Sequence, residues 1–175
     1  TGTSNAGVII TVRTSNGGNL GSVTVPAGGA FSVPLSLTPG VYIINAVATN
    51  AGGNSAPTSN LTITINPQPP VIVTPAANTT TANGTVAISG TGYAGSTVTV
   101  LDGAVSVGTF TVDAAGNWGG NVALGLGAHT LNVTQSINGA TSAATSRSVG
   151  ILPPAPTITS PAANANLPNG NNVIA

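Results

Sequence analysis

Side chains that could carry acid–base chemistry are rare in this sequence: two aspartates, two arginines and one histidine, with no lysine, glutamate or cysteine. His129 could pair with Asp102 or Asp113 as a catalytic dyad, in which a carboxylate orients an imidazole base. In the internal repeat described below, however, Tyr42 occupies the position of His129. Because a catalytic base would not alternate with tyrosine, we predict a structural role for His129 and no enzymatic activity.

The composition also excludes several classes of ligand. Charged residues make up 2% of the 175 residues, against about a quarter in an average soluble domain. Two cationic side chains cannot neutralise a nucleic-acid backbone. Calcium takes about six to eight oxygen ligands, usually with several carboxylates, and thiolate sites need cysteine. We therefore predict no nucleic-acid partner, no metal site and no cofactor. No apolar run approaches the roughly 20 residues of a membrane helix, so we expect no membrane insertion within this segment.

Two further kinds of polar residue have a candidate role. Arg13 and Arg147 have no arginine counterpart in the repeat, and we expect them at solvent-facing tips or in local pairs. Four Asn-x-Ser/Thr triplets are candidate glycosylation sites, although a chain this rich in Asn, Ser and Thr contains a few by chance. They begin at Asn60, Asn78, Asn83 and Asn132.

An internal repeat is the strongest pattern in the sequence. The matching segments are Gly2–Gly7 with Gly90–Gly95, Gly21–Val25 with Gly108–Val112, Leu37–Tyr42 with Leu124–His129, and Pro70–Pro75 with Pro156–Pro161. The offset between them drifts from 88 to 86 residues. The chain therefore holds two copies of a unit of about 87 residues, which differ in length by single-residue insertions and deletions.

Proline-rich segments mark the expected domain boundaries, since proline cannot donate to a β-ladder and stiffens an extended chain. They are Pro67–Pro70 and Pro153–Pro156. We predict an Ig-like domain over 1–66 that lacks its first strands, a complete Ig-like domain over 67–152, and a linker with the first strands of a following domain over 153–175.

The complete copy has the pattern of a sandwich. Short runs rich in Val, Ile and Thr alternate with small polar residues and are separated by turn residues. The expected strands are Val71–Thr74, Gly84–Ser89, Ser96–Leu101, Val107–Val112, Trp118–Leu124, His129–Gln135 and Thr141–Val149. No segment of ten or more residues has helical periodicity. This pattern predicts an all-β chain of tandem immunoglobulin-like β-sandwiches.

Four residues are predicted structural anchors. Phe31 and Trp118 open the fifth strand in their respective copies, where a core anchor is more common than a sugar platform. Tyr42 and His129 lie near the start of the sixth strand, an arrangement that resembles the tyrosine corner, where a ring tip bonds the backbone. The alternation along the strands further predicts burial of a set of core residues: Trp118, Leu131, Val133, Val98 and Val100.

The best-preserved runs resemble the bacterial Ig-like repeats of large surface adhesins and extracellular filaments. These runs are Gly90–Val100, Gly108–Trp118 and Leu126–Val133. The resemblance covers nearly the whole chain and implies tandem sandwiches on a cell surface. Many such repeats bind calcium through acidic residues at their domain joints. The joints here contain no acidic residue, so calcium stiffening is not implied.

These observations favour a structural repeat unit of an extracellular bacterial filament or adhesin shaft, whose partner is a neighbouring copy of itself. The alternative is a glycan- or host-protein-binding Ig-like module, which would show a long or aromatic-rich loop in one copy. The two copies have no such difference. With so few charges, stability and self-association are expected to vary weakly with salt and with pH between about 5 and 9.

The position of the repeat within the chain predicts how copies assemble. Residues 1–66 lack two strands, and residues 155–175 repeat the sequence of the missing part. We therefore expect 155–175 to complete 1–66 of the next copy. Either one long polypeptide continues from Ala175 into the next Thr1, the version we favour, or separate subunits exchange strands. The distance from the carbonyl carbon of Ala175 to the nitrogen of the next Thr1 distinguishes the two.

Overall fold

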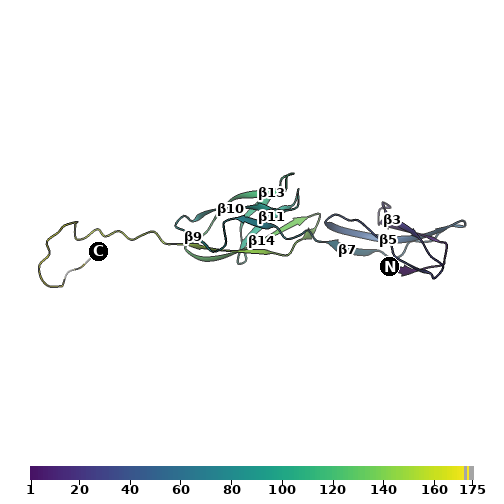
Figure 1. Ribbon diagram of the computed structural model, residues 1–175, viewed down its shortest axis with the longest axis horizontal. Helices are drawn as coiled ribbons and strands as arrows, with labels where there is room; N and C mark the ends of the chain where they lie inside the picture. The colour runs from purple at the N-terminus through teal and green to yellow at the C-terminus, as the bar shows by residue number, and fades with distance from the viewer. Residues whose placement is uncertain (172, 174–175) are drawn as a thin grey trace.

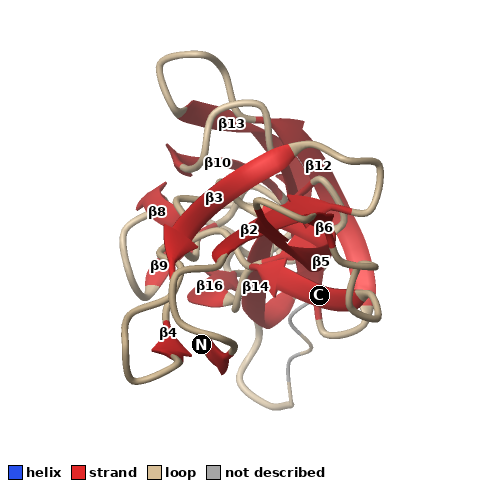
Figure 2. Ribbon diagram, turned by 90° about the vertical axis from the view of Figure 1, so that its right-hand side faces the viewer, coloured by secondary structure: helices blue, strands red, loops and turns tan. Residues whose placement is uncertain are grey.

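Short runs of β-branched residues between Gly- and Asn-containing turns form the strands of this protein. The computed structural model describes residues 1–171 and 173. These residues contain sixteen strands and no helix, and the view along the long axis shows only strands and loops (Figure 2). The strands form two sandwiches arranged end to end, with residues 1–66 at one end of an elongated molecule (Figure 1). The all-β sandwich fold is therefore confirmed.

Residues 67–152 form a two-layer sandwich. One layer has the strand order β13-β10-β8, and the other has the order β12-β11-β14-β16-β9, with β15 also paired to β14. Every pair is antiparallel except β16 with β9. The strands are β8 (Val71–Thr74), β9 (Thr79–Thr81), β10 (Thr85–Thr91), β11 (Thr97–Asp102), β12 (Val105–Thr111), β13 (Asn117–Ala123), β14 (Gly127–Ile137), β15 (Ala140–Thr141) and β16 (Thr145–Ile151).

Residues 1–66 form one comparable layer and one much smaller layer. The larger sheet has the order β3-β2-β5-β6, with β7 also paired to β5, and the smaller is the two-stranded pair β1-β4. The strands are β1 (Gly2–Thr3), β2 (Ile9–Thr14), β3 (Asn19–Thr24), β4 (Ala30–Phe31), β5 (Gly40–Asn50), β6 (Gly53–Asn54) and β7 (Leu61–Ile65). In the described part of residues 1–66 no strand corresponds to β8 or β9, and β1 corresponds only to the end of β10.

The two regions share strand register as well as sequence. Gly2 pairs with Phe31, and Gly90, the matching glycine, pairs with Trp118. The antiparallel pair β2–β3 shifts register after Val12, and β11–β12 shifts after Val100. Equivalent positions can therefore be compared residue by residue between the two regions.

Strand β9 is the element that sequence reasoning missed. Thr79–Thr81 is short, entirely polar and without alternation, so nothing in its pattern indicates a strand. It forms by pairing in parallel with β16, about 70 residues further along the chain. The last predicted strand is also divided in two, into β15 and β16, by an interruption at 142–144.

The core of 67–152 is continuous. Thirteen buried hydrophobic residues from both layers form a single cluster, with Val107 and Phe110 packed against it. The predicted burial of five core residues is confirmed, since each is at most 4% exposed: Val98, Val100, Trp118, Leu131 and Val133. Trp118 also stacks on Phe110, with ring centroids 6.1 Å apart.

The proline-rich segment between the two sandwiches packs against the second one. Pro67 and Pro70 are buried. The carbonyl oxygen of Gln68 accepts a hydrogen bond from the side-chain amide of Gln135, and that of Pro70 accepts one from the Thr145 hydroxyl at 2.6 Å. This segment is therefore fixed to the second sandwich by its backbone as well as by its rings.

Residues 153–171 extend away from the second sandwich on the side opposite the first (Figure 1). The described part of 153–173 contains no strand. The strands that the sequence predicts in this segment need a partner sheet, because an isolated extended segment cannot pair its backbone groups. Ala175 lies outside the described residues, and with it the predicted distance to the next Thr1.

Candidate functional site

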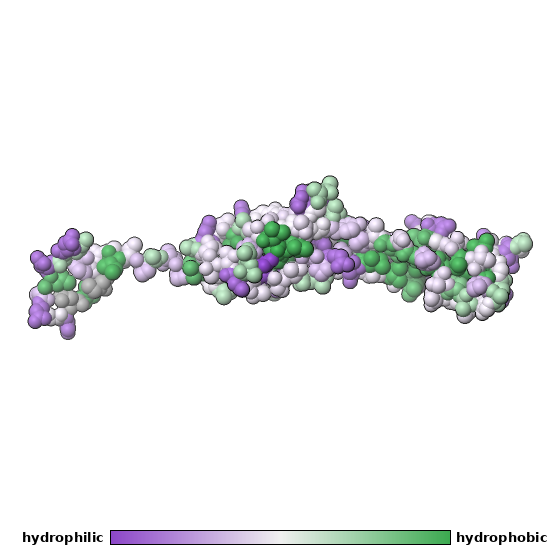
Figure 3. Space-filling view, in the orientation of Figure 1, coloured by the Kyte–Doolittle hydropathy of each residue, from purple (hydrophilic) through white to green (hydrophobic). Residues whose placement is uncertain are grey.

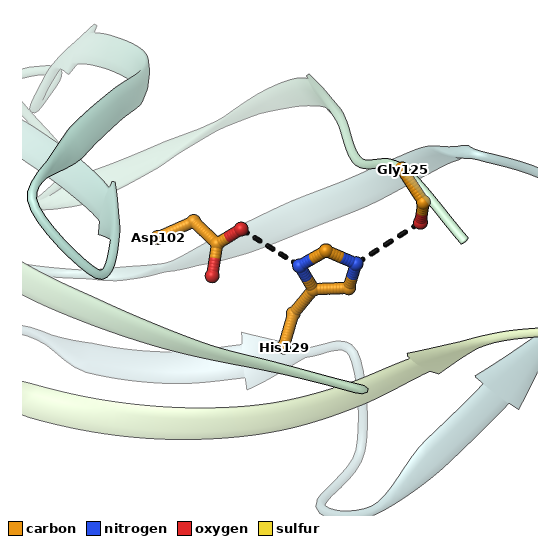
Figure 4. A network of polar contacts seen from close by, with 3 residues as sticks. All are labelled: Asp102, Gly125 and His129. Carbon is orange, nitrogen blue, oxygen red and sulfur yellow. Dashed lines mark hydrogen bonds and ion pairs between the residues drawn. The ribbon is translucent and has the colours of Figure 1, made fainter. Parts of the chain in front are cut away.

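His129 makes two polar contacts through its ring (Figure 4). Its Nδ1 atom lies 2.7 Å from a carboxylate oxygen of Asp102, and its Nε2 atom lies 3.0 Å from the carbonyl oxygen of Gly125. Both partners are acceptors, so the doubly protonated ring satisfies both contacts. The hydrogen bond to Asp102, followed by that to Gly125, raises the pKa of His129 above its ordinary value of 6.5, against a small opposing effect of burial.

This arrangement does not suit a catalytic base or a metal ligand, because both ring nitrogens are occupied by protein atoms. Tyr42 makes the equivalent contact in the first sandwich. Its hydroxyl donates to the carbonyl oxygen of Thr38 at 2.9 Å, four residues upstream, as Gly125 is four residues upstream of His129. Each side chain thus ties the start of a central strand to the loop before it.

The remaining charged side chains contact their own neighbourhood. Asp113 accepts a hydrogen bond from the backbone of Asn117 at 2.8 Å within a turn. Arg13 donates to the Asn45 side chain at 3.0 Å. Arg147 is half-buried rather than solvent-facing, and donates across the sandwich to the carbonyl oxygen of Ile72 at 2.6 Å. No three His, Cys, Asp or Glu side chains gather at a metal-binding distance within residues 1–171 and 173.

The four glycosylation candidates lie in different settings. The Asn60, Asn78 and Asn83 side chains are exposed, and Asn132 is half-buried on β14. Asn132 accepts a hydrogen bond from Ser146 at 2.7 Å, and Asn60 accepts one from Asn45 at 3.1 Å. Glycosylation at these positions stays a prediction.

The two aromatic residues at matching positions have different surroundings. Trp118 is buried, and its indole N–H donates to the carbonyl oxygen of Thr91 at 3.1 Å. Phe31 is only half-buried. It lies in the wall of an open cleft of about 440 Å³ in the first sandwich, together with Val12, Leu35 and Ile44.

This cleft is the most distinctive surface of residues 1–66. It lies between the inner face of β2 and β5 and the small β1–β4 pair. At the offset of the repeat, its lining residues Phe31, Leu35 and Ile44 correspond to three core residues of the other sandwich: Trp118, Val122 and Leu131, at 4%, 1% and 0% exposed. The cleft is therefore the interior of a sandwich with part of one layer missing.

Apolar residues are also exposed on β5 and β7, and one of them, Leu61, lines the cleft. Val41 and Ile43 on β5 and Leu61 on β7 are 44%, 46% and 59% exposed. Hydrophobic residues gather over these two strands, at the end of the first sandwich nearest the second (green in Figure 3). The matching positions in the second sandwich are Ala128, Thr130 and Arg147.

Gln135 is a functional residue that sequence reasoning missed. It is 2% exposed and its side-chain oxygen accepts hydrogen bonds from the Tyr93 backbone at 2.8 Å and the Ser96 hydroxyl at 2.7 Å. Its side-chain amide donates to the carbonyl oxygen of Gln68, in the Pro67–Pro70 segment that forms the joint between the two sandwiches. The available signal was a polar side chain in register with the inward-facing Leu131 and Val133.

Residues 1–64 match the family model of a bacterial Ig domain. The resemblance to bacterial Ig-like domains is thus confirmed over this part of the chain. No curated protein matches the sequence. The described residues include no helix with the length and hydrophobicity that crossing a bilayer would need.

Solved structures with similar folds include pairs of sandwich domains. A two-domain fibronectin type III segment from chicken tenascin aligns with a TM-score of 0.55 and 16% identity, covering 84% of this chain and 85% of that one. A biofilm-associated protein, BSP domain, aligns at 0.37 and 23% identity over 84% of this chain. The present chain spans 25% of that protein's chain. Domains 4 and 5 of the S-layer protein SbsC align at 0.31 and 14% identity, covering 85% and 73%.

Proposed function

Because residues 1–64 match a bacterial Ig domain, we propose that this chain is a structural repeat of an extracellular bacterial surface filament or adhesin shaft. The observation that carries the proposal is the end-to-end placement of two sandwiches with a built joint between them (Figure 1). In such a shaft the joints between sandwiches set the spacing, so length grows with the number of repeats.

The joint has contacts on both of its sides. The β14–β15 turn of the second sandwich reaches the first, where the carbonyl oxygen of Asn138 accepts a hydrogen bond from the Val41 backbone at 3.1 Å. The Asn138 side chain donates to the carbonyl oxygen of Pro39 at 3.4 Å. A side chain on Gly40 would approach Asn138 to 3.2 Å, so glycine allows this close approach.

Gln135 restrains the other side of the joint. Its hydrogen bond to the Gln68 carbonyl links the connecting segment to the core of the second sandwich. A buried amide with hydrogen bonds at both its oxygen and its nitrogen is a strong restraint, because any movement that breaks them leaves a polar group unsatisfied. A shaft needs joints of this kind to transmit force without bending freely.

Small-angle X-ray scattering of the full chain tests the proposal. An elongated particle with one preferred angle between the sandwiches is expected. The distribution of this angle should broaden in the double variant Asn138→Ala/Gln135→Ala. Electron microscopy of the native material should show long, uniform fibres. A freely hinged pair, or isolated beads on the cells, would contradict the shaft role and favour a binding module.

A further inference from the structure

The cleft of residues 1–66 has the chemistry of a sandwich interior that lacks one of its strands. In the second sandwich, β8 pairs with the end of β10 through Val71–Thr91 and Ile72–Gly90. The equivalent edge in the first sandwich is β1, which among the described residues pairs only with β4. Its other edge is available for a further strand, which is a ready template for strand addition.

The chain contains a segment with the sequence of the missing strand. Pro156-Thr-Ile-Thr-Ser-Pro161 repeats Pro70-Val-Ile-Val-Thr-Pro75. Ile158, at the position of Ile72, is 72% exposed, whereas Ile72 is 5% exposed. Ile158 therefore lacks, in the described chain, the burial that Ile72 has at the matching position.

The conformation that follows this segment is also repeated. Asn78 has a φ of 58° and Asn164, 86 residues further on, has a φ of 63°. This left-handed conformation is uncommon outside glycine. Asn164 therefore has the left-handed conformation that follows β8, although residues 153–171 and 173 contain no strand.

We propose that residues 156–161 of one copy add to β1 of a second copy and close its cleft. The register follows from the second sandwich: Thr157 lies opposite Thr3, and Ile158 lies opposite Gly2 and fills the cleft beside Phe31. Ser59, which lines the cleft, takes the place of Thr145 and donates to the carbonyl oxygen of Pro156.

Within the described residues, this segment cannot reach the cleft of its own chain. Residues 153–171 leave the second sandwich in the direction away from the first (Figure 1), so a complete sandwich separates this segment from the cleft. The inference rests on the proposed function, since an end-to-end assembly brings the two surfaces together. Its result is a shaft in which every junction between copies is a shared sandwich.

A cysteine pair tests the register directly, because the chain has no cysteine of its own. In Thr3→Cys/Thr157→Cys, the two Cβ atoms of neighbouring copies should lie about 4.5–5.5 Å apart, within reach of a disulfide after small adjustment. Oxidation of the full chain should give a ladder of covalent oligomers on a non-reducing gel. The matched control is Ser22→Cys/Thr157→Cys, which places the first thiol on the exposed face of β3. Equal ladders from both variants would overturn the proposal.

A second variant tests the apolar contact. Ile158→Asp should weaken association of the full chain on the order of 100-fold, because a carboxylate would replace a buried side chain. Val105→Asp is the control, since Val105 is similarly exposed, at 66%, but lies on β12. Both residues are exposed in the single chain, so both variants should fold. Light scattering that shows monomers only, or equal association of the two variants, contradicts strand addition.

These results separate the two proposals. A shaft of stiff, tandem sandwiches without strand addition would keep the elongated scattering profile and give no specific covalent ladder. If the cysteine pair gives a specific covalent ladder but scattering shows that the two sandwiches hinge freely, strand addition is supported and the stiff shaft is rejected.

Discussion

Residues 1–66 and 67–152 share their strand order and register but differ in how much apolar surface they remove from water. Of the hydrophobic side chains buried in the described chain, only Ile10, Val25 and Val47 belong to the first region. The second region contributes the remaining fourteen. Equivalent sequences therefore give equivalent sheets, whereas a core needs both layers to be present.

The difference teaches what β8, β9 and the first part of β10 contribute. These elements supply Ile72, Val86 and Ile88, all buried, and cover the inner face of the opposite sheet. Without them, Ile44 and Phe31 are half-buried, while Leu131 and Trp118 at the matching positions are at most 4% exposed. Hydrophobic stabilisation follows the area removed from water, so the first region should be the less stable one when it stands alone.

The largest expected effect comes from truncating matched core positions. Leu131→Ala should destabilise the second sandwich by about 2–5 kcal/mol, whereas Ile44→Ala should cost the first under about 2 kcal/mol, since its side chain already contacts solvent. Trp118 is the only tryptophan, so its fluorescence in urea reports the second sandwich alone. Amide hydrogen exchange of β5 reports the first. Similar costs at both positions would show that the cleft is closed in solution.

The matched glycines Gly90 and Gly2 should differ in how strongly a substitution by alanine affects their two sandwiches. A Cβ atom on Gly90 would lie 1.8 Å from the carbonyl oxygen of Val71, so Gly90→Ala must displace β8. We expect a cost of about 1–3 kcal/mol, seen as a lower urea midpoint of Trp118 fluorescence. The three atoms nearest to a Cβ atom on Gly2 all belong to the Phe31 ring, the first at 2.7 Å, and this ring can rotate into the open cleft. Gly2→Ala should therefore change hydrogen exchange in β1 and β2 very little.

A substitution at the polar joint should lower stability by a smaller amount, and a neighbouring residue of the joint provides the control. Gln135→Ala gives the second sandwich the residue that the first has at this position, Ala48. It leaves the Ser96 hydroxyl and the Tyr93 backbone without their buried acceptor, at an expected cost of about 1–3 kcal/mol in urea unfolding. Gln68→Ala keeps the backbone carbonyl that Gln135 binds, so it should be neutral. A large effect of Gln68→Ala would mean that its side chain, rather than its backbone, holds the joint.

The smallest expected effect is a pH dependence confined to the second sandwich. The pKa of folded His129 is raised, so proton binding favours the folded state. This stabilisation is complete below the ordinary value of 6.5 and is lost as the pH rises through the higher folded value. The melting temperature reported by Trp118 should fall slightly over that window. His129→Tyr, which copies Tyr42, should remove the slope, and a slope that persists would point to another titrating group.

Several features of the fold could be predicted from local pattern. Alternation on the strands was sufficient to predict burial of Val98, Val100, Leu131 and Val133, because side chains of a strand point to opposite faces in turn. The internal repeat identified Phe31 and Trp118, and likewise Tyr42 and His129, as equivalent positions in the two copies. The polar strand β9 could not be predicted, since its pairing with β16 depends on a distant segment rather than on its own composition.

The site depended more on tertiary structure. The sequence contained one histidine and two aspartates, but only the fold placed His129 against Asp102, and Arg147 across the sandwich against Ile72. Hydrogen bonds to these partners join residues 27 and 75 positions apart, and no local pattern encodes such distances.

The sequence by itself determined that this protein is built from repeated β-sandwiches with very few ionisable groups, because strand periodicity, turn residues and composition are local properties. Only the tertiary structure decided that Gln135 holds the joint, that Arg147 donates across the sandwich to Ile72, and that Ile158 is largely exposed. Burial is a property of what lies opposite a side chain, and what lies opposite is set by the folded arrangement of distant segments.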